Sequence, residues 1–469
     1  MKISKLASTI TLMSAICASP ALAQDIEPAL DAPAEAMSAA QDNNQAGDVS
    51  DDSGFSVSGF VEAAGSASLR PFDKSEISEC GGRIKVKPEY RISNYTLFAD
   101  LDYFANSGSA FETRETNTIE AVELNIRGGK TLRWCAGKQR FLWGAGDTFQ
   151  PSNFIDRPDL REAFSRDLDD RYSGVYAISL KYIFGDYGIE AALRPVTESA
   201  LAPAGFFAQT PQAIETPAGT LDTRYATQQT ETALDKSSFG IRAGGTSGIF
   251  DWHLVYYNGI QNLLLYGTKL VTDESGDTFV EAGEVRQHVN AFGADLSFAV
   301  DKWNLRAEAA FSHDMTAVRK ASEDNFGAIY ARAAEQGSAA IQDATRRPFA
   351  SYSAGFDYNL WGNYGMIYAE WMQARYLRES GVEAVLQSDI LLVRIEDKYL
   401  DEALTLKLQS MTCLREKKPG LSFNAEALYD FKIGLTASMG LWYFIANDDE
   451  YTAMFEDRRM IYANVRYNF

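Results

Sequence analysis

Residues 461–469, the last nine of the chain, read Ile-Tyr-Ala-Asn-Val-Arg-Tyr-Asn-Phe. Every second side chain from Ile461 to Phe469 is apolar, and the side chains between them include Asn464, Arg466 and Asn468. Successive side chains of a β-strand point to opposite faces, so this stretch predicts a strand with one apolar and one polar face. The same period of two recurs through much of the chain, for example in 54–65, 187–193, 303–311 and 432–445.

The connections between such stretches alternate between short and long. Turn residues fill short ones such as Gly128-Gly129, Gly185-Asp186 and Asp397-Lys398, whereas the longest connections cover 143–170, 197–235, 261–285 and 314–347. Short turns at one end and long loops at the other are typical of outer-membrane barrels, with turns in the periplasm and loops outside the cell. We therefore predict an all-β fold, a single antiparallel transmembrane β-barrel of about 18 strands, with 16 as the second choice. Strands are expected, among others, at 130–142, 302–313 and 400–412.

The N-terminal region predicts export. Lys2 and Lys5 precede an uncharged apolar stretch, and Ala21-Leu22-Ala23 offers small residues at a cleavage site before Gln24. Residues 1–23 are thus expected to be a signal peptide. Residues 24–53 contain eight acidic residues and no Lys or Arg, which predicts a disordered periplasmic segment ahead of a barrel spanning 54–469.

A membrane location follows from three further observations. No window of about twenty residues is apolar enough for a membrane-spanning helix, and without such helices only a closed barrel can cross a bilayer. Aromatic residues make up 12% of the chain, which fits the girdles of a barrel at both membrane interfaces. The final strand ends in Phe469 and resembles the signal read by the barrel insertion machinery of the Gram-negative outer membrane. The expected partners are therefore that machinery and outer-membrane lipids.

Composition argues against several other classes. The net charge of −20 is unfavourable for a nucleic-acid partner. Three cysteines follow the signal peptide, Cys80, Cys135 and Cys413, which is too few for a disulfide scaffold. The three histidines have no metal-ligand spacing, and no Ser/His set appears. His313-Asp314 resembles the Asp/His pair of outer-membrane proteases, but a single pair at a loop edge is ordinary surface polarity. We expect neither enzymatic activity nor a cofactor.

Charged side chains on the polar faces of the strands are expected to point into the barrel, because a carboxylate facing hydrocarbon is costly. Either they form a hydrogen-bonded polar interior or they line a hydrated passage, for which 16 to 18 strands leave room. The same register places Arg466 and Glu308 in water, and Val465 and Leu305 against lipid. The candidate lumen-lining residues are Glu62, Asp100, Asp102, Glu190, Arg306, Glu308, Asp357 and Arg466.

The connection at 143–171 is the candidate constriction loop. It is dense in Asp and Arg, with Gly and Pro breaks, which indicates a folded loop with internal ion pairs. In general porins the loop after the fifth strand folds into the lumen and sets its width; the alternative is an extracellular cap packed on neighbouring loops. Its candidate residues are Asp147, Asp156, Arg157, Asp159, Arg161, Asp167, Asp170 and Arg171.

This region also carries a family resemblance. Gly137-Lys138-Gln139, Trp143-Gly-Ala-Gly-Asp, Pro151-Ser-Asn and Asp170-Arg-Tyr-Ser-Gly resemble a family of porin-like outer-membrane proteins of unassigned function. Ala145 stands where a charged residue is common in that family. Its members often accompany exporters of the RND type that handle hydrophobic molecules, so the resemblance implies an RND-type exporter as a partner and apolar cargo. It assigns no role to any residue.

Two functions remain open from the sequence. The first is a porin-like channel that passes small solutes, or hydrophobic compounds if the family resemblance extends to cargo. The second is a structural or surface-interaction barrel whose lumen is blocked. The loop 314–347 also contains an Ala-rich stretch, Phe326–Ala344, for which we expect a surface helix or a lid.

Overall fold

The computed structural model describes residues 53–69, 79–106, 118–159, 171–198, 201, 213–216, 219–225, 236–260, 266–273, 275–285, 288–318, 326–342, 344–360, 365–377, 388–414, 420–445 and 459–469. Arg161, Asp167 and Asp170 lie outside these residues, as do the expected signal peptide and nearly all of the acidic segment. Within the described residues, no helix is long and apolar enough to cross a membrane.

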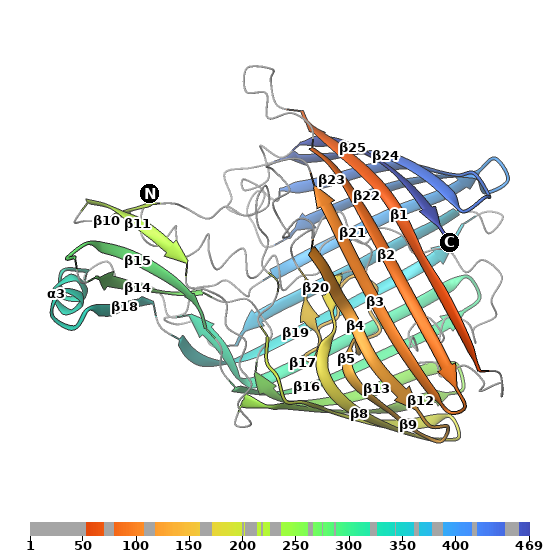
Figure 1. Cartoon of the computed structure of the whole chain (residues 1–469), viewed down its shortest axis with the longest axis horizontal. Helices are drawn as coiled ribbons and strands as arrows, with labels where there is room; N and C mark the ends of the chain where they lie inside the picture. The colour runs from red at the N-terminus through yellow and green to blue at the C-terminus, as the bar shows by residue number, and fades with distance from the viewer. Residues whose placement is uncertain are drawn as a thin grey trace.

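Eighteen antiparallel strands form one closed wall (Figure 1). They are β1 (Gly54–Ser68), β2 (Glu79–Ile92), β3 (Tyr95–Asn106), β4 (Thr118–Gly128), β5 (Leu132–Gln139), β8 (Val175–Phe184), β9 (Tyr187–Arg194), β12 (Ser238–Ser247), β13 (Phe250–Ile260), β16 (His288–Val300), β17 (Trp303–Val318), β19 (Ala344–Asn359), β20 (Gly365–Tyr376), β21 (Ser388–Tyr399), β22 (Leu404–Cys413), β23 (Leu421–Asp430), β24 (Leu435–Ile445) and β25 (Met460–Asn468). Each pairs with the next, and β1 pairs with β25 to close the barrel, with Glu62 opposite Arg466. The predicted fold class and the preferred strand number are confirmed.

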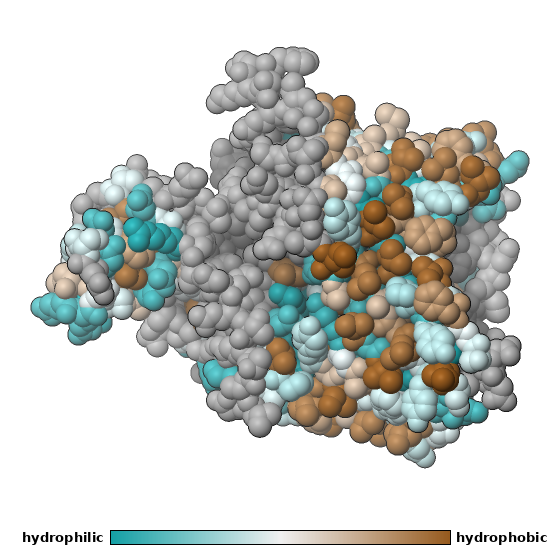
Figure 2. Space-filling model, viewed as in Figure 1, coloured by the Kyte–Doolittle hydropathy of each residue, from teal (hydrophilic) through white to brown (hydrophobic). Residues whose placement is uncertain are grey.

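The strands alternate in burial as the period of two predicts. In β8 the burial pattern switches at every residue from Val175 to Lys181, with Tyr176, Ile178 and Leu180 about half exposed. The exposed positions point outward and are mostly apolar, and Figure 2 shows apolar side chains spread over this outer wall. An apolar outer face and a polar inner face are what a bilayer-spanning barrel requires.

Short turns connect the strands at one end, and several need a backbone that most residues avoid. Ser93, Asp301 and Gly185 have positive φ angles of 54°, 54° and 62°, and residues with small or short polar side chains tolerate that region best. The predicted turn at Asp397-Lys398 is wrong, because both residues belong to β21. The chain turns at 400–403 instead, where Leu400, Asp401 and Glu402 all have positive φ.

The long connections at the other end build a second, smaller sheet that the sequence did not predict (Figure 1). It contains β10 (Ala213–Thr216), β11 (Gly219–Tyr225), β15 (Thr278–Glu284), β14 (Tyr266–Thr272) and β18 (Ser338–Gln342), in that order. Helix α3 (Phe326–Gln336) packs on it through a small apolar core around Leu270, Val280 and Ala333. The core draws on three connections, because Leu221 of β11 also packs against it, so these loops hold one another in place.

The helix expected over Phe326–Ala344 forms only in its first part. It ends at Gln336, and Gly337 follows with a φ of 78°, the left-handed conformation that commonly terminates helices. Residues after Gly337 then become β18, which pairs with β14. Strand pairing therefore overrides the helix preference of Ala339 and Ala340.

Candidate constriction site

The fifth barrel strand ends earlier than predicted, and the chain then leaves the wall. β5 stops at Gln139 rather than at residue 142. Leu142 has a φ of 48° and Gly144 a φ of 149°, and the Asp156 carboxylate accepts hydrogen bonds from the backbone N–H groups of Phe141 and Leu142 at 2.9 and 2.6 Å. We call residues 140–159 the inner loop, because their contacts place them inside the barrel.

Apolar side chains fix the base of the inner loop to the inner wall. Trp143 and Ile155 are fully buried, and they share one cluster with Phe141 and with inward residues of the wall. The indole Nε1 of Trp143 donates to Glu190 on β9 at 3.3 Å. The wall residues of the cluster come from β8, β9, β13, β16, β17, β19 and β20, and include Val175, Ala192, Val255, Val289, Met315, Phe349 and Tyr376.

Glu308 on β17 anchors the middle of the inner loop. Its Oε1 accepts hydrogen bonds from the backbone N–H groups of Ala145 and Gly146, each at 2.5 Å. Its Oε2 accepts from the N–H and the hydroxyl of Ser152, at 3.2 and 2.7 Å. Hydrogen bonds to a carboxylate are among the stronger ones in proteins, and Glu308 is only 3% exposed.

Glu370 on β20 supplies a second anchor of the same kind. It accepts hydrogen bonds from the backbone N–H groups of Thr148 and Phe149, at 3.0 and 3.2 Å, and from the hydroxyl of Tyr368. The Tyr368 hydroxyl also bonds to the Thr148 hydroxyl at 3.1 Å. Around the wall, β17 and β20 lie six and eight strands from β5, where nine would be diametrically opposite. The inner loop therefore reaches across the barrel.

Glycines make this close approach feasible. A Cβ on Gly144 would lie 2.8 Å from Glu308 Oε1, and one on Gly146 would lie 2.7 Å from Glu370 Oε1. On the wall, a Cβ at Gly240 of β12 would lie 2.8 Å from the Trp143 ring, and one at Gly293 of β16 would lie 2.8 Å from the Ser152 Cβ. A larger residue at Gly240 or Gly293 therefore requires the inner loop to move, and one at Gly144 or Gly146 displaces the carboxylate that anchors the loop.

Arg306 on β17 joins the inner loop to β19. Its guanidinium lies 2.8 Å from the Asp147 carboxylate and also pairs with Asp357. Burial raises the pKa of the Asp147 carboxyl, and Arg306 opposes that rise. Burial likewise raises the pKa of Asp156, against the donors at Phe141, Leu142 and Asn153. The side chains of Asp147 and Asp357 are 19% and 12% exposed, so this ion-paired group is in partial contact with solvent.

The other candidates of the constriction loop serve its return to the wall. Arg157 and Tyr172 belong to a short pairing of β6 (Arg157–Pro158) with β7 (Tyr172–Ser173). The Asp159 N–H donates to the Arg171 carbonyl at 2.6 Å, and Arg157 pairs with Glu198 at 3.4 Å. These residues close the loop rather than line a passage.

The wall away from the inner loop carries paired charges. Arg83 of β2 makes a two-point contact with Asp102 of β3, at 2.8 and 2.6 Å. Arg466 pairs with Glu62 across the barrel seam at 2.7 Å. Arg140, at the start of the inner loop, lies 3.5 Å from Asp100 and 3.0 Å from Glu123. All eight candidate lumen residues thus make polar contacts on the inner side.

Sequence reasoning missed several residues of this site. Three further residues lie inside the barrel: Glu370, Tyr368 and Arg83. The alternation of apolar and polar residues along β20 and β2 could have identified them, because each lies on the inner face of its strand. His253 is a further one: its Nδ1 lies 2.9 Å from Arg242 and 2.7 Å from Asp295. The described residues contain no group of three or more His, Cys, Asp and Glu side chains that could hold a metal ion.

Comparisons with known proteins find solved structures of similar fold, at low sequence identity. No family model and no curated protein matches the chain. A variant of Rhodopseudomonas blastica porin shares 13% identity with a TM-score of 0.40, covering 89% of this chain and all of that one. Pseudomonas aeruginosa OccK8 (OprE) shares 10% identity with a TM-score of 0.49, over 88% of this chain and 98% of that one. At these identities the comparisons show a likeness of fold and no function.

Proposed function

We propose that this protein is an outer-membrane channel for small solutes, with the inner loop as its constriction. The observation that carries the proposal is the pair of carboxylates, Glu308 and Glu370, that hold the inner loop across the barrel interior. A loop that only capped the barrel would need no hydrogen-bond acceptors such as Glu308 and Glu370 on the inner face of the opposite wall. Loops held in this way narrow a wide barrel to a passage lined by selected side chains, here Asp147, Arg306 and Asp357.

Ion pairing at the constriction favours small polar solutes as cargo. Both signs of charge stand within one group, so the passage is expected to discriminate weakly between small cations and anions. The family resemblance instead implies hydrophobic cargo and an RND-type exporter as a partner, and uptake by a deletion strain separates the two. Loss of uptake of small sugars or amino acids supports the polar passage, whereas an unchanged uptake with altered tolerance to apolar compounds supports the alternative.

Planar lipid bilayers test the channel directly. Purified wild-type protein is expected to insert and give discrete, reproducible conductance steps. A protein that inserts, shown by a heat-dependent shift in gel mobility, yet stays electrically silent would contradict the proposal.

A barrel without transport, acting through its extracellular sheet, is the second candidate. It is favoured by the very low exposure of inner side chains, 0% for Asp100 and 2% for Arg394, which indicates a tightly filled interior. The same recording decides between the two, because this candidate predicts the silent barrel. Insertion through the final strand and Phe469 by the barrel insertion machinery belongs to both proposals.

A further inference from the structure

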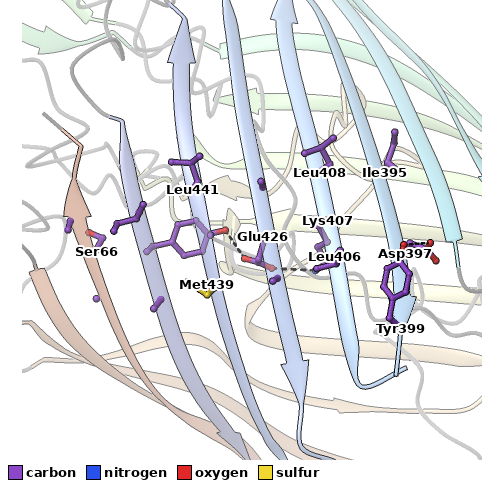
Figure 3. Close-up of a pocket in the computed structure, with 18 of the residues that line it drawn as sticks. Ser66, Ile395, Asp397, Tyr399, Leu406, Lys407, Leu408, Glu426, Met439 and Leu441 are labelled. Carbon is purple, nitrogen blue, oxygen red and sulfur yellow. Dashed lines mark hydrogen bonds and ion pairs between the residues drawn. The ribbon is translucent and has the colours of Figure 1, made fainter. Parts of the chain in front are cut away.

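The outer wall of the barrel carries a groove that is separate from the constriction inside the barrel. It has a volume of about 1170 Å³ and lies over β20 to β25 and the adjoining ends of β1 and β2. Figure 3 shows Leu406, Leu408, Met439 and Leu441 along it. Leu408, Leu406 and Met439 are 43%, 42% and 67% exposed, which identifies the groove as part of the outward face.

Small residues create the groove. On β23 the outward residues Ala425 and Ala427 stand opposite Leu408 and Leu406 of β22. On the other side Ala425 and Ala427 stand opposite Leu441 and Met439 of β24. A row of alanines between two rows of long side chains leaves a trough along the strand. Ala463 and Gly65 continue the low floor beyond Met439.

The groove crosses the wall obliquely. One ladder of directly paired residues runs from Ile367 on β20 to Ala67 on β1 and crosses seven strands. Six inter-strand steps of about 4.8 Å make that ladder roughly 29 Å long. This is close to the hydrocarbon thickness of a bilayer, about 30 Å. The groove is therefore long enough to follow an extended acyl chain.

The end of the groove that lies near the short turns is acidic. Asp397 lines the groove there and accepts hydrogen bonds from the Lys398 N–H and the Tyr399 hydroxyl, at 2.9 and 2.8 Å. The adjoining turn adds Asp401 and Glu402, and the Lys398 ammonium lies 4.0 Å from Glu402. Lys407 and Glu426, which also line the groove, pair with each other at 3.9 Å. These four carboxylates against two ammonium groups leave an excess of negative charge, which attracts an amine-bearing headgroup and repels an anionic one.

We propose that this groove binds a phospholipid with an ethanolamine headgroup from the periplasmic leaflet. An acyl chain lies over Ala425 and Ala427, and the lipid ammonium lies beside Asp397. The proposal rests on the barrel standing in a membrane but not on conduction through its lumen. A silent barrel with a bound lipid, or a conducting barrel without one, would separate the two proposals.

Native mass spectrometry of the detergent-purified protein tests it, with phosphatidylethanolamine and phosphatidylglycerol of identical acyl chains as probes. Wild type is expected to retain the ethanolamine lipid preferentially. Ala427→Phe fills the trough and is expected to lower lipid occupancy at least fivefold. Ala437→Phe is the matched control, because Ala437 lies on β24 outside the groove. Asp397→Asn is expected to remove the headgroup preference while lipid remains bound, whereas Asp430→Asn at the neighbouring turn retains it.

Two results would overturn the proposal. One is equal lipid occupancy in wild type and in Ala427→Phe, with both folded by heat-modifiability; Ala463→Leu serves if the first variant does not fold. The other is a lipid-free oligomer that Ala427→Phe dissociates, since the occupant of the groove would then be a second copy of the chain.

Discussion

At the residue scale, Glu308 is the most demanding position, because it serves four donors of the inner loop. In Glu308→Gln one oxygen becomes an NH₂ group that faces N–H and O–H donors. Leaving buried donors unsatisfied costs about 1–3 kcal/mol. We expect a more mobile inner loop, seen as larger and noisier conductance steps in planar bilayers.

The matched control for this variant is Glu62→Gln. Glu62 is also an inner carboxylate but pairs with Arg466 at the seam, away from the inner loop. Equal conductance changes in both variants would show that the effect is one of lumen charge and not of the anchor.

Gly240 carries a second residue-scale prediction. Because a Cβ there would lie 2.8 Å from the Trp143 ring, Gly240→Val is expected to displace the indole from its fully buried site. Trp143 should then become more accessible to an aqueous fluorescence quencher, and the melting temperature should fall. Gly54→Ala is the control, since a Cβ at Gly54 has no atom within 4 Å. An unchanged quenching profile in Gly240→Val would mean that the Trp143 ring does not lie against Gly240.

At the element scale, the inner loop should be attachable to the wall by a covalent bond. The Cβ of Ser152 lies 2.8 Å from the position of a Cβ on Gly293, so small shifts bring two cysteines to the 3.5–4.5 Å of a disulfide. In a variant without Cys80, Ser152→Cys with Gly293→Cys is expected to cross-link spontaneously and to raise the melting temperature. Conductance should stay the same, because the bond fixes the loop where it already lies.

Pairing Ser152→Cys with Gly248→Cys provides the control, since Gly248 lies in a short turn at the opposite end of the strands. A cross-link that forms equally well in both pairs would mean that the inner loop has no fixed position.

The barrel strands could be predicted from the sequence, whereas the position of the inner loop could not. The strands were predictable because a period of two is a local property, visible within ten residues such as Tyr187–Arg194. The inner loop was not, since its place depends on contacts such as Ala145 with Glu308, 163 residues apart. Gly144 and Gly146 looked like ordinary loop glycines, and only the carboxylates that they approach give them a specific role.

At the scale of the whole molecule, the register of the wall can be tested from outside. Val465→Cys is expected to resist a charged, water-soluble thiol reagent in liposomes, because Val465 faces outward and is 48% exposed. Arg466→Cys should react, since Arg466 points inward with 22% of its side chain exposed. Reversed reactivity would mean a slip by one residue.

Glu308 is a poor labelling site for the same test, although the sequence places it on the water side. It lies beneath the inner loop and is almost fully buried, so a cysteine there would stay unreactive for a reason unrelated to register. Alternation predicts the direction of a side chain, whereas its contact with water depends on what lies above it.

The five-stranded sheet outside the barrel also imposes an order on assembly. Its strands come from three separate connections, with β11, β15 and β18 contributed by segments that follow β9, β13 and β17. The sheet cannot be completed until the chain is available as far as Gln342, and eleven of the eighteen barrel strands precede that residue in the sequence. This sheet is therefore a late step in folding. Deletion of 338–342, which removes β18 and keeps all eighteen barrel strands, should leave the two earlier hairpins more sensitive to protease than in the wild type.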